Sequence, residues 1–187
     1  MFLCIVTIAY SPEWSSDYIK RKVREIQQSN GKLGITQTIS LKYPTVKLDT
    51  IPQKELNDAF SRIITDIKPD IVFLPQNGDL NKDHRIVYEA ALVASRLFSA
   101  VIKKILAYET LSKTEWGRSL SPFKPDVYFV ITGYLELKNK AMSVFKSELK
   151  SAPHPRSLDL IAALAEKRGS EAGIKYAEAF MLIREII

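Results

Sequence analysis

The stretch DIVFLPQNGDLNKDHR, residues 70–85, decides the fold class of this chain. Its first six residues form a short apolar run, which predicts a buried strand, and the polar residues that follow predict a loop. Asp83 is a suitable N-cap for a helix that we expect to run to about Phe98, because apolar residues then recur at helical spacing. A strand, a loop and a helix in this order are typical of a βα unit in a parallel sheet.

The same alternation continues in both directions from this stretch. Toward the N-terminus, the pattern predicts a strand buried on both faces, a helix begun by Ser15 or Ser16, an extended piece and a second helix, at residues 2–9, 16–30, 36–41 and 52–68. Toward the C-terminus it predicts strands at residues 103–108 and 126–131, separated by a long irregular loop. Helices at 135–149 and 157–167 follow, and the last segment, 177–187, is a strand or a short helix. No repeat or linker interrupts the pattern, so we expect one α/β domain over residues 1–187, with a mostly parallel sheet flanked by helices.

Composition excludes several classes of protein. The chain has 187 residues, of which 46% are hydrophobic and 26% charged, so it can bury a core and is not disordered. The net charge of +6 is spread along the chain, and its densest run, at residues 20–24, reads as a solvated helix face, so no nucleic-acid partner is predicted. No apolar stretch is long enough to span a membrane, and the apolar opening lacks the positive residues of a signal sequence, which favours a cytoplasmic protein. The single cysteine, Cys4, is expected in the core.

The loop at residues 76–85 is the candidate site, because ligands of open parallel sheets bind beyond the carboxyl ends of the strands. A histidine beside carboxylates can be a metal ligand or an acid/base group, although a helix cap with a surface histidine would have the same sequence. One histidine cannot make a zinc site, which needs about three protein ligands. Glycine-rich phosphate loops, a Gly-x-Ser-x-Gly elbow and a His-Glu-x-x-His helix are absent from the sequence.

The motifs IVFLP at 71–75, GDLNKDHRIV at 78–87 and ASR at 94–96 together resemble the second signature of the LmbE-like (PIG-L) N-acetylglucosaminyl deacetylases. Further short segments resemble one bacterial branch of that family, in the same order along nearly the whole chain. They lie at residues 33–35, 47–52, 108–116, 123–126, 138–140, 147–149, 153–157, 168–169 and 177–180.

The resemblance implies a Rossmann-like α/β fold and zinc-assisted hydrolysis of the acetamide of an amino sugar or glycoconjugate. In the family, a first strand ends in His-Pro-Asp-Asp, which supplies two zinc ligands and the general base. This chain has no such motif, and its first strand corresponds to the family's second. We therefore expect an N-terminally shortened domain in which zinc occupancy is doubtful and which does not hydrolyse amides as it stands.

The resemblance also assigns roles to residues of the loop. His84 corresponds to the family's remaining metal ligand. Asp83 and Asn81 are the candidates for a catalytic role, with Asp83 either capping the helix or orienting the metal shell. Asp79 and Arg85 are candidates for substrate binding, although Arg85 could equally pair with a structural carboxylate.

Two aromatic side chains outside this loop have expected roles. Trp116 is a candidate for stacking on a sugar face or for pinning its loop to the core. His154, between two prolines, is expected to be structural or at a pocket rim. The alternatives to a deacetylase are a non-catalytic sugar-binding or vestigial domain, and a structural domain whose loop has no ligand. An exposed strand edge at residues 2–9 would also favour a homo-oligomer.

Overall fold

The computed structural model describes residues 1–97 and 101–187. Its contacts divide the chain into two compact units, one formed by residues 1–45 and 128–178 and the other by residues 46–127 and 179–187. Each unit is therefore built from two separate stretches of the sequence. The predicted end of a helix at Phe98 lies outside the described residues.

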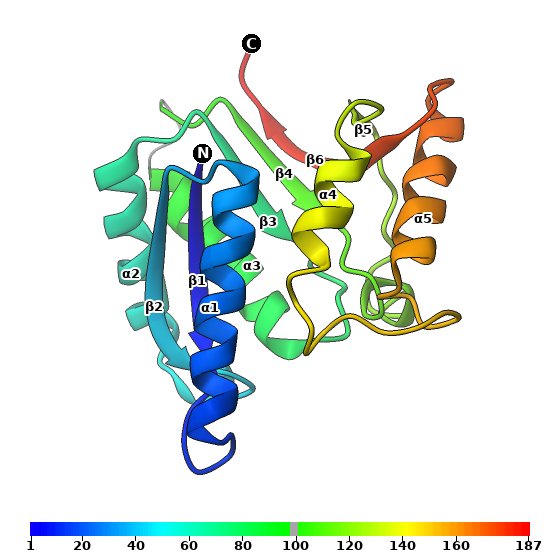
Figure 1. The fold of residues 1–187 in the computed structure, drawn as a ribbon. Coiled ribbons are helices and arrows are strands. Elements are labelled where there is room, and N and C mark those ends of the chain that lie inside the picture. Colours follow the sequence, from blue (N-terminus) through cyan, green and yellow to red (C-terminus); the bar gives the residue numbers. More distant parts are fainter. Residues whose placement is uncertain (98–100) are drawn as a thin grey trace. The chain divides into compact units, whose positions relative to one another are not determined.

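The first unit contains a strand pair and three helices, β1 (Phe2–Ile8), α1 (Ser16–Leu33), β2 (Gln37–Pro44), α4 (Leu135–Met142) and α5 (Leu158–Glu171). β1 and β2 are parallel and run side by side (Figure 1). Helix α1 packs on α4, and α4 packs on α5. The predicted helix at residues 135–149 is thus too long, since regular helix ends at Met142 and the chain continues in turns.

Helix α1 has the caps that its sequence predicts, but it is longer than expected. The Ser15 hydroxyl accepts a hydrogen bond from the backbone N–H of Tyr18, as an N-cap residue does. The helix does not stop at residue 30, because Gly31 is tolerated inside it. It ends at Gly34, which adopts a left-handed conformation with φ 66°, and only glycine does so without steric cost.

The prediction that the first strand is buried on both faces is wrong. No residue of β1 is fully buried, and Phe2 is 46% exposed. Among the described residues β1 pairs only with β2, so one of its edges has no neighbouring strand. The missing neighbour leaves the backbone and the side chains along that edge of β1 open, which accounts for part of the exposure of this apolar sequence. Burial still raises the pKa of the Cys4 thiol to about 11, which excludes it as a ready nucleophile.

The second unit contains residues 70–85, for which the sequence predicts a βα unit. Its elements are η1 (Leu48–Thr50), α2 (Gln53–Ile67), β3 (Ile71–Pro75), α3 (Lys82–Leu97), β4 (Lys104–Tyr108) and η2 (Thr114–Trp116). β3 and β4 are parallel, and α3 packs on both β3 and α2. The predicted βα unit is confirmed, and Figure 1 shows α3 following β3 in the chain.

The last two strands, β5 (Val127–Val130) and β6 (Ala177–Glu185), contain residues of both units. They extend the β3–β4 pair to a four-stranded sheet of order β3-β4-β6-β5. The open question about the C-terminal segment is settled in favour of a strand. Because β6 runs antiparallel to β4, the expected parallel arrangement holds for β1–β2 and β3–β4 but not for β6, and this sheet is mixed.

Candidate functional site

The candidate site lies in the second unit, in the loop that joins β3 to α3. Gln76, the first residue after β3, is fully buried and holds the loop from both ends of its amide. Its Oε1 accepts a hydrogen bond from the backbone N–H of Gly78 at 2.7 Å, and its Nε2 donates to the Ser121 carbonyl at 2.8 Å. The loop is therefore fixed against the segment around Ser121 before any charged residue contributes.

Asp79 and His84 form the central pair of this loop. The Asp79 carboxylate is 0% exposed, and its Oδ2 accepts a hydrogen bond from His84 Nδ1 at 2.9 Å. A carboxylate on Nδ1 fixes the proton there, so the other ring nitrogen, Nε2, presents its lone pair. The His84 side chain is 26% exposed and Nε2 contacts no partner among the described residues. The Asp79 carboxylate is therefore buried, whereas His84 Nε2 remains available to a ligand.

The electrostatics of Asp79 agree with this arrangement. Burial acts to raise the pKa of Asp79, but hydrogen bonds from His84 and from the backbone N–H of Asn81 outweigh it, and the pKa is lowered. The neighbouring Tyr108, at the end of β4, responds in the opposite sense. Burial and the negative charge of Asp79 raise the pKa of Tyr108 to about 12. Asp79 is therefore an anion and Tyr108 a neutral phenol at ordinary pH.

The predicted N-cap of α3, Asp83, is not the residue that caps this helix. Asn81, not Asp83, caps α3, since its Oδ1 accepts a hydrogen bond from the Asp83 backbone N–H at 3.0 Å. Asp83 is already inside the first turn and is 6% exposed. Its carboxylate accepts hydrogen bonds from the backbone N–H groups of Val46 at 2.6 Å and Leu48 at 3.3 Å. Asp83 thereby pins the segment that leads into η1.

Glycines let two loops of the second unit approach each other at backbone distance. A Cβ atom built on Gly117 would lie 1.6 Å from the Gly78 carbonyl oxygen, and one built on Gly78 would lie 2.1 Å from the Ser121 oxygen. No larger residue fits at either position without moving backbone. The close approach places Trp116, the neighbour of Gly117, on the loop that packs against the Asp79–His84 loop.

The exposure of Trp116 excludes one of its two expected roles, that of anchoring its loop to the core. Its side chain is 71% exposed, so it does not pin the loop to a core. Arg85 is likewise used differently from either expectation, because its Nη1 donates to the backbone carbonyl oxygens of Asp79 and Leu80, at 2.7 and 2.9 Å. Arg85 therefore helps to hold the loop in shape.

His154 belongs to the other unit and to a separate cluster of charges. Its Nδ1 accepts a hydrogen bond from the Arg156 backbone N–H at 3.0 Å, which is a structural use of the ring. Arg156 and Lys22 both pair with Glu148. Burial acts to raise the pKa of Glu148, but these two cations lower it.

The residues present do not suffice for a zinc site. Within residues 1–97 and 101–187, no three His, Cys, Asp or Glu side chains come together in a way that could hold a metal ion. Asp83 is occupied by backbone N–H groups and Asp79 by His84, which leaves His84 Nε2 as the available ligand of the loop. Since zinc sites take about three protein ligands, this chain alone offers an incomplete one.

Sequence reasoning missed Gln76 and Tyr108 as members of the site. Each stands where a parallel strand ends, Gln76 directly after β3 and Tyr108 as the last residue of β4, and the Gln76 backbone N–H donates to the Tyr108 carbonyl at 3.1 Å. The rule that sites form at the carboxyl ends of parallel strands could have pointed to both.

Comparisons with known proteins agree with the predicted resemblance. Residues 7–95 match the family model described as PIG-L, GlcNAc-PI de-N-acetylase. The range contains β3, the Asp79–His84 loop and most of α3, so the match covers the candidate site.

No helix of the described residues is long and apolar enough to cross a membrane.

Solved structures share the fold over nearly all of the chain. The N,N'-diacetylchitobiose deacetylase from Pyrococcus horikoshii is 19% identical, with a TM-score of 0.73, and the match covers 97% of this chain and 72% of that one. GalB, the 4-carboxy-2-hydroxymuconate hydratase from Pseudomonas putida KT2440, is 15% identical, with a TM-score of 0.76 and coverages of 98% and 85%. The zinc-inhibited form of teicoplanin deacetylase Orf2 is 14% identical, with a TM-score of 0.69 and coverages of 96% and 86%.

These findings confirm the LmbE-like (PIG-L) resemblance and the Rossmann-like α/β fold. The structural relatives include deacetylases and a hydratase, so the fold by itself is compatible with more than one reaction. The reaction must be argued from the residues of the site.

Proposed function

We propose that this chain provides part of an N-deacetylase site for an N-acetylglucosaminyl-type amino sugar or glycoconjugate, and that these 187 residues alone do not hydrolyse the amide. The observation that carries the proposal is the Asp79–His84 pair, in which a fully buried carboxylate orients the histidine and Nε2 stays open.

In this proposal His84 is the metal ligand and Asp79 its positioning residue. Carboxylate–histidine pairs of this kind fix the tautomer and raise the basicity of a ligating imidazole. Zinc, when bound, would activate water and polarise the acyl oxygen. The described residues do not form a complete zinc site, so the remaining ligands and the general base must come from the His-Pro-Asp-Asp type of segment that this sequence lacks.

The free edge of β1 supports this division of labour. β1 pairs with β2 along one edge only among the described residues, and its side chains are partly exposed. Such an edge is complementary to a further strand. A strand that ends in His-Pro-Asp-Asp would pair with this edge through main-chain hydrogen bonds.

Trp116 is the proposed sugar platform. It is 71% exposed, and its loop packs backbone to backbone against the loop that carries His84. Tryptophan offers a large flat face for a sugar ring. In this proposal Arg85 keeps its loop-holding role through Nη1 and can offer further donors to a substrate anion.

The test is acetate release from a panel of N-acetylglucosaminyl conjugates. We expect none from the 187-residue chain, and zinc-dependent release when a strand bearing His-Pro-Asp-Asp is joined upstream of Met1. His84→Ala should abolish the release, whereas His154→Ala, the matched change at the other histidine, should leave it. An extended protein that folds and binds zinc, but releases no acetate from any conjugate, would overturn the deacetylase proposal.

The alternative is a non-catalytic sugar-binding domain, which the exposure of Trp116 favours independently of the metal. Titration of the unmodified chain with N-acetylglucosamine, read by calorimetry, tests it. Binding that is lost in Trp116→Ala, and kept in Tyr134→Ala at another exposed aromatic, would support this alternative if no extended protein is active.

A further inference from the structure

A cavity of about 560 Å³ lies in the second unit, well away from the Asp79–His84 pair. It lies between the last turns of α3 and the strands β4 and β6, and its lining is Leu92, Val93, Ser95, Arg96, Ile102, Ile105, Ile183 and Arg184. Its size is that of small-molecule sites, which hold roughly 300–1,000 Å³. His84 is in the first turn of α3 and Arg96 in the last, about 18 Å apart along the helix.

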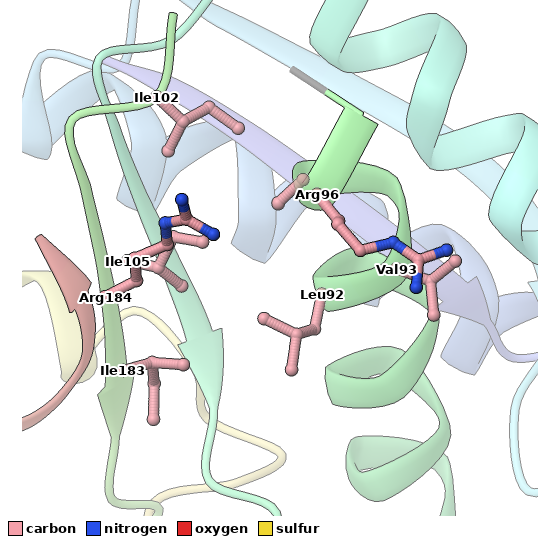
Figure 2. Close-up of a pocket in the computed structure, with 8 residues that line it drawn as sticks. Leu92, Val93, Arg96, Ile102, Ile105, Ile183 and Arg184 are labelled. Atoms are coloured by element: carbon pink, nitrogen blue, oxygen red, sulfur yellow. The ribbon is translucent and has the colours of Figure 1, made fainter. Parts of the chain in front are cut away.

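The walls of this cavity are aliphatic, and they come from both sides. Figure 2 shows Leu92 pointing from α3 toward the strands, where Ile105 of β4 and Ile183 of β6 face it. Ser95 contributes no free hydroxyl, because it donates to the Ala91 carbonyl at 2.7 Å. An occupant of this part of the cavity must therefore be apolar.

The polar groups at the cavity are two arginines, one from each side. Arg96 comes from α3 and Arg184 from β6, and both are exposed. Neither side chain forms a hydrogen bond or an ion pair with another described residue, and the nearest acid along β6, Glu185, is already paired with Lys104 at 2.6 Å. The two guanidinium groups therefore leave uncompensated positive charge beside an apolar cavity.

A break in strand register places Arg184 here. Ile105 is opposite Arg184 and Leu106 is opposite Leu182, so Ile183 is the extra residue of a β-bulge. Successive residues of a regular strand face opposite sides, but a bulge redirects a side chain, and here Ile183 and Arg184 both line the cavity. The irregular strand thus combines an apolar wall and a cation in one site.

We propose that this cavity binds a single-chain aliphatic anion, with its hydrocarbon chain against Leu92, Ile105 and Ile183 and its carboxylate or phosphate on Arg184, while Arg96 on the α3 side adds positive charge. Guanidinium groups bind both head groups well, often through two parallel hydrogen bonds. This binding site is separate from the proposed deacetylase site and does not depend on it.

The test is calorimetric titration of the 187-residue chain with decanoate, decyl phosphate and decyltrimethylammonium, each below its micelle concentration. We expect one decanoate or decyl phosphate per chain and at least tenfold weaker binding of the cation. The double variant Arg96→Ala/Arg184→Ala should weaken anion binding at least tenfold. Arg62→Ala, at an exposed arginine of α2, is the matched control and should leave it unchanged.

Charge reversal keeps the proposal testable if the double variant is unstable. Arg184→Glu, at an exposed position, should lower decanoate affinity at least tenfold and reduce the preference for anions over decyltrimethylammonium. Equal binding of anion and cation, or anion binding unchanged in both variants, would overturn the proposal. So would the absence of binding at millimolar decanoate by a folded chain.

Discussion

A cluster of partly buried charge in the first unit and one in the second differ in whether all of their polar groups are paired. In the first unit Glu25 is 4% exposed and accepts two hydrogen bonds from Ser147, from its backbone N–H at 3.2 Å and its hydroxyl at 2.9 Å. Lys22 lies 3.8 Å from Glu25 and also pairs with Glu148, which Arg156 holds from the other side. Every carboxylate of this cluster is used inside the unit.

The Asp79–His84 cluster of the second unit is closed on one side only. Asp79 is as buried as Glu25, but its partner His84 is a quarter exposed, and its Nε2 has no partner among the described residues. This difference assigns stability to the first cluster and chemistry to the second. A closed network contributes stability, whereas an open nitrogen held by a buried carboxylate offers a ligand or a proton acceptor.

The largest expected effect comes from the backbone support of the open cluster. Gly117→Ala places a Cβ atom 1.6 Å from the Gly78 carbonyl oxygen, and backbone cannot yield as a flexible side chain would. We expect a loss of about 3 kcal/mol or more in the free energy of unfolding, measured by urea denaturation. Gly133→Ala, where nothing lies within 4 Å, should stay within about 0.5 kcal/mol. Equal effects of the two changes would refute the close loop packing.

The next largest loss of stability is expected when the closed cluster of the first unit is disrupted. Glu25→Ala removes the acceptor of two Ser147 hydrogen bonds and one partner of Lys22, so we expect a loss of about 2–3 kcal/mol in the same measurement. Glu166→Ala, at an exposed position of α5, is the control and should be near neutral. Zinc binding should not change in either variant. A loss of zinc binding in folded Glu25→Ala would show that this cluster is not merely structural.

The pH dependence of stability tests the buried half of the open cluster. Because the pKa of Asp79 is lowered in the folded state, its stabilisation is complete above the ordinary carboxyl pKa, about 3.9, and is lost as pH falls through the folded pKa. Asp79→Asn should therefore cost about 1–2 kcal/mol at pH 7. The difference in unfolding free energy between Asp79→Asn and the parent chain should become smaller below pH 4. A difference that is constant or grows toward low pH would contradict the assigned role of the carboxylate.

The last effect on stability is expected at His84 itself. Its Nε2 has no partner to lose, but His84→Ala deprives the buried Asp79 carboxylate of its imidazole donor, so we expect a loss of about 1–2 kcal/mol in thermal or urea unfolding. A cost well above that value would place His84 among the closed, structural groups.

Sequence patterns predicted the elements of the second unit well because its strand, loop and helix follow local rules. The end of α1 at Gly34 and the cap on α3 show the limit, since Gly31 and Asp83 satisfy the same local preferences as the residues that are used. The exposure of β1 depends on which strands are its neighbours, and the partners of Asp79 and Asp83 depend on loop geometry. These are tertiary facts that no local pattern contains.

Nitrogen-15 NMR of the two imidazole rings, recorded during a zinc titration, tests whether His84 Nε2 is the available metal ligand. The sequence has two histidines, His84 and His154, so four ring nitrogens are observed. We expect a protonated Nδ1 on His84, weak zinc binding that shifts the His84 Nε2 signal alone, and loss of this binding in His84→Ala. Stoichiometric, chelator-resistant zinc that persists in His84→Ala, or zinc on His84 Nδ1, would contradict it.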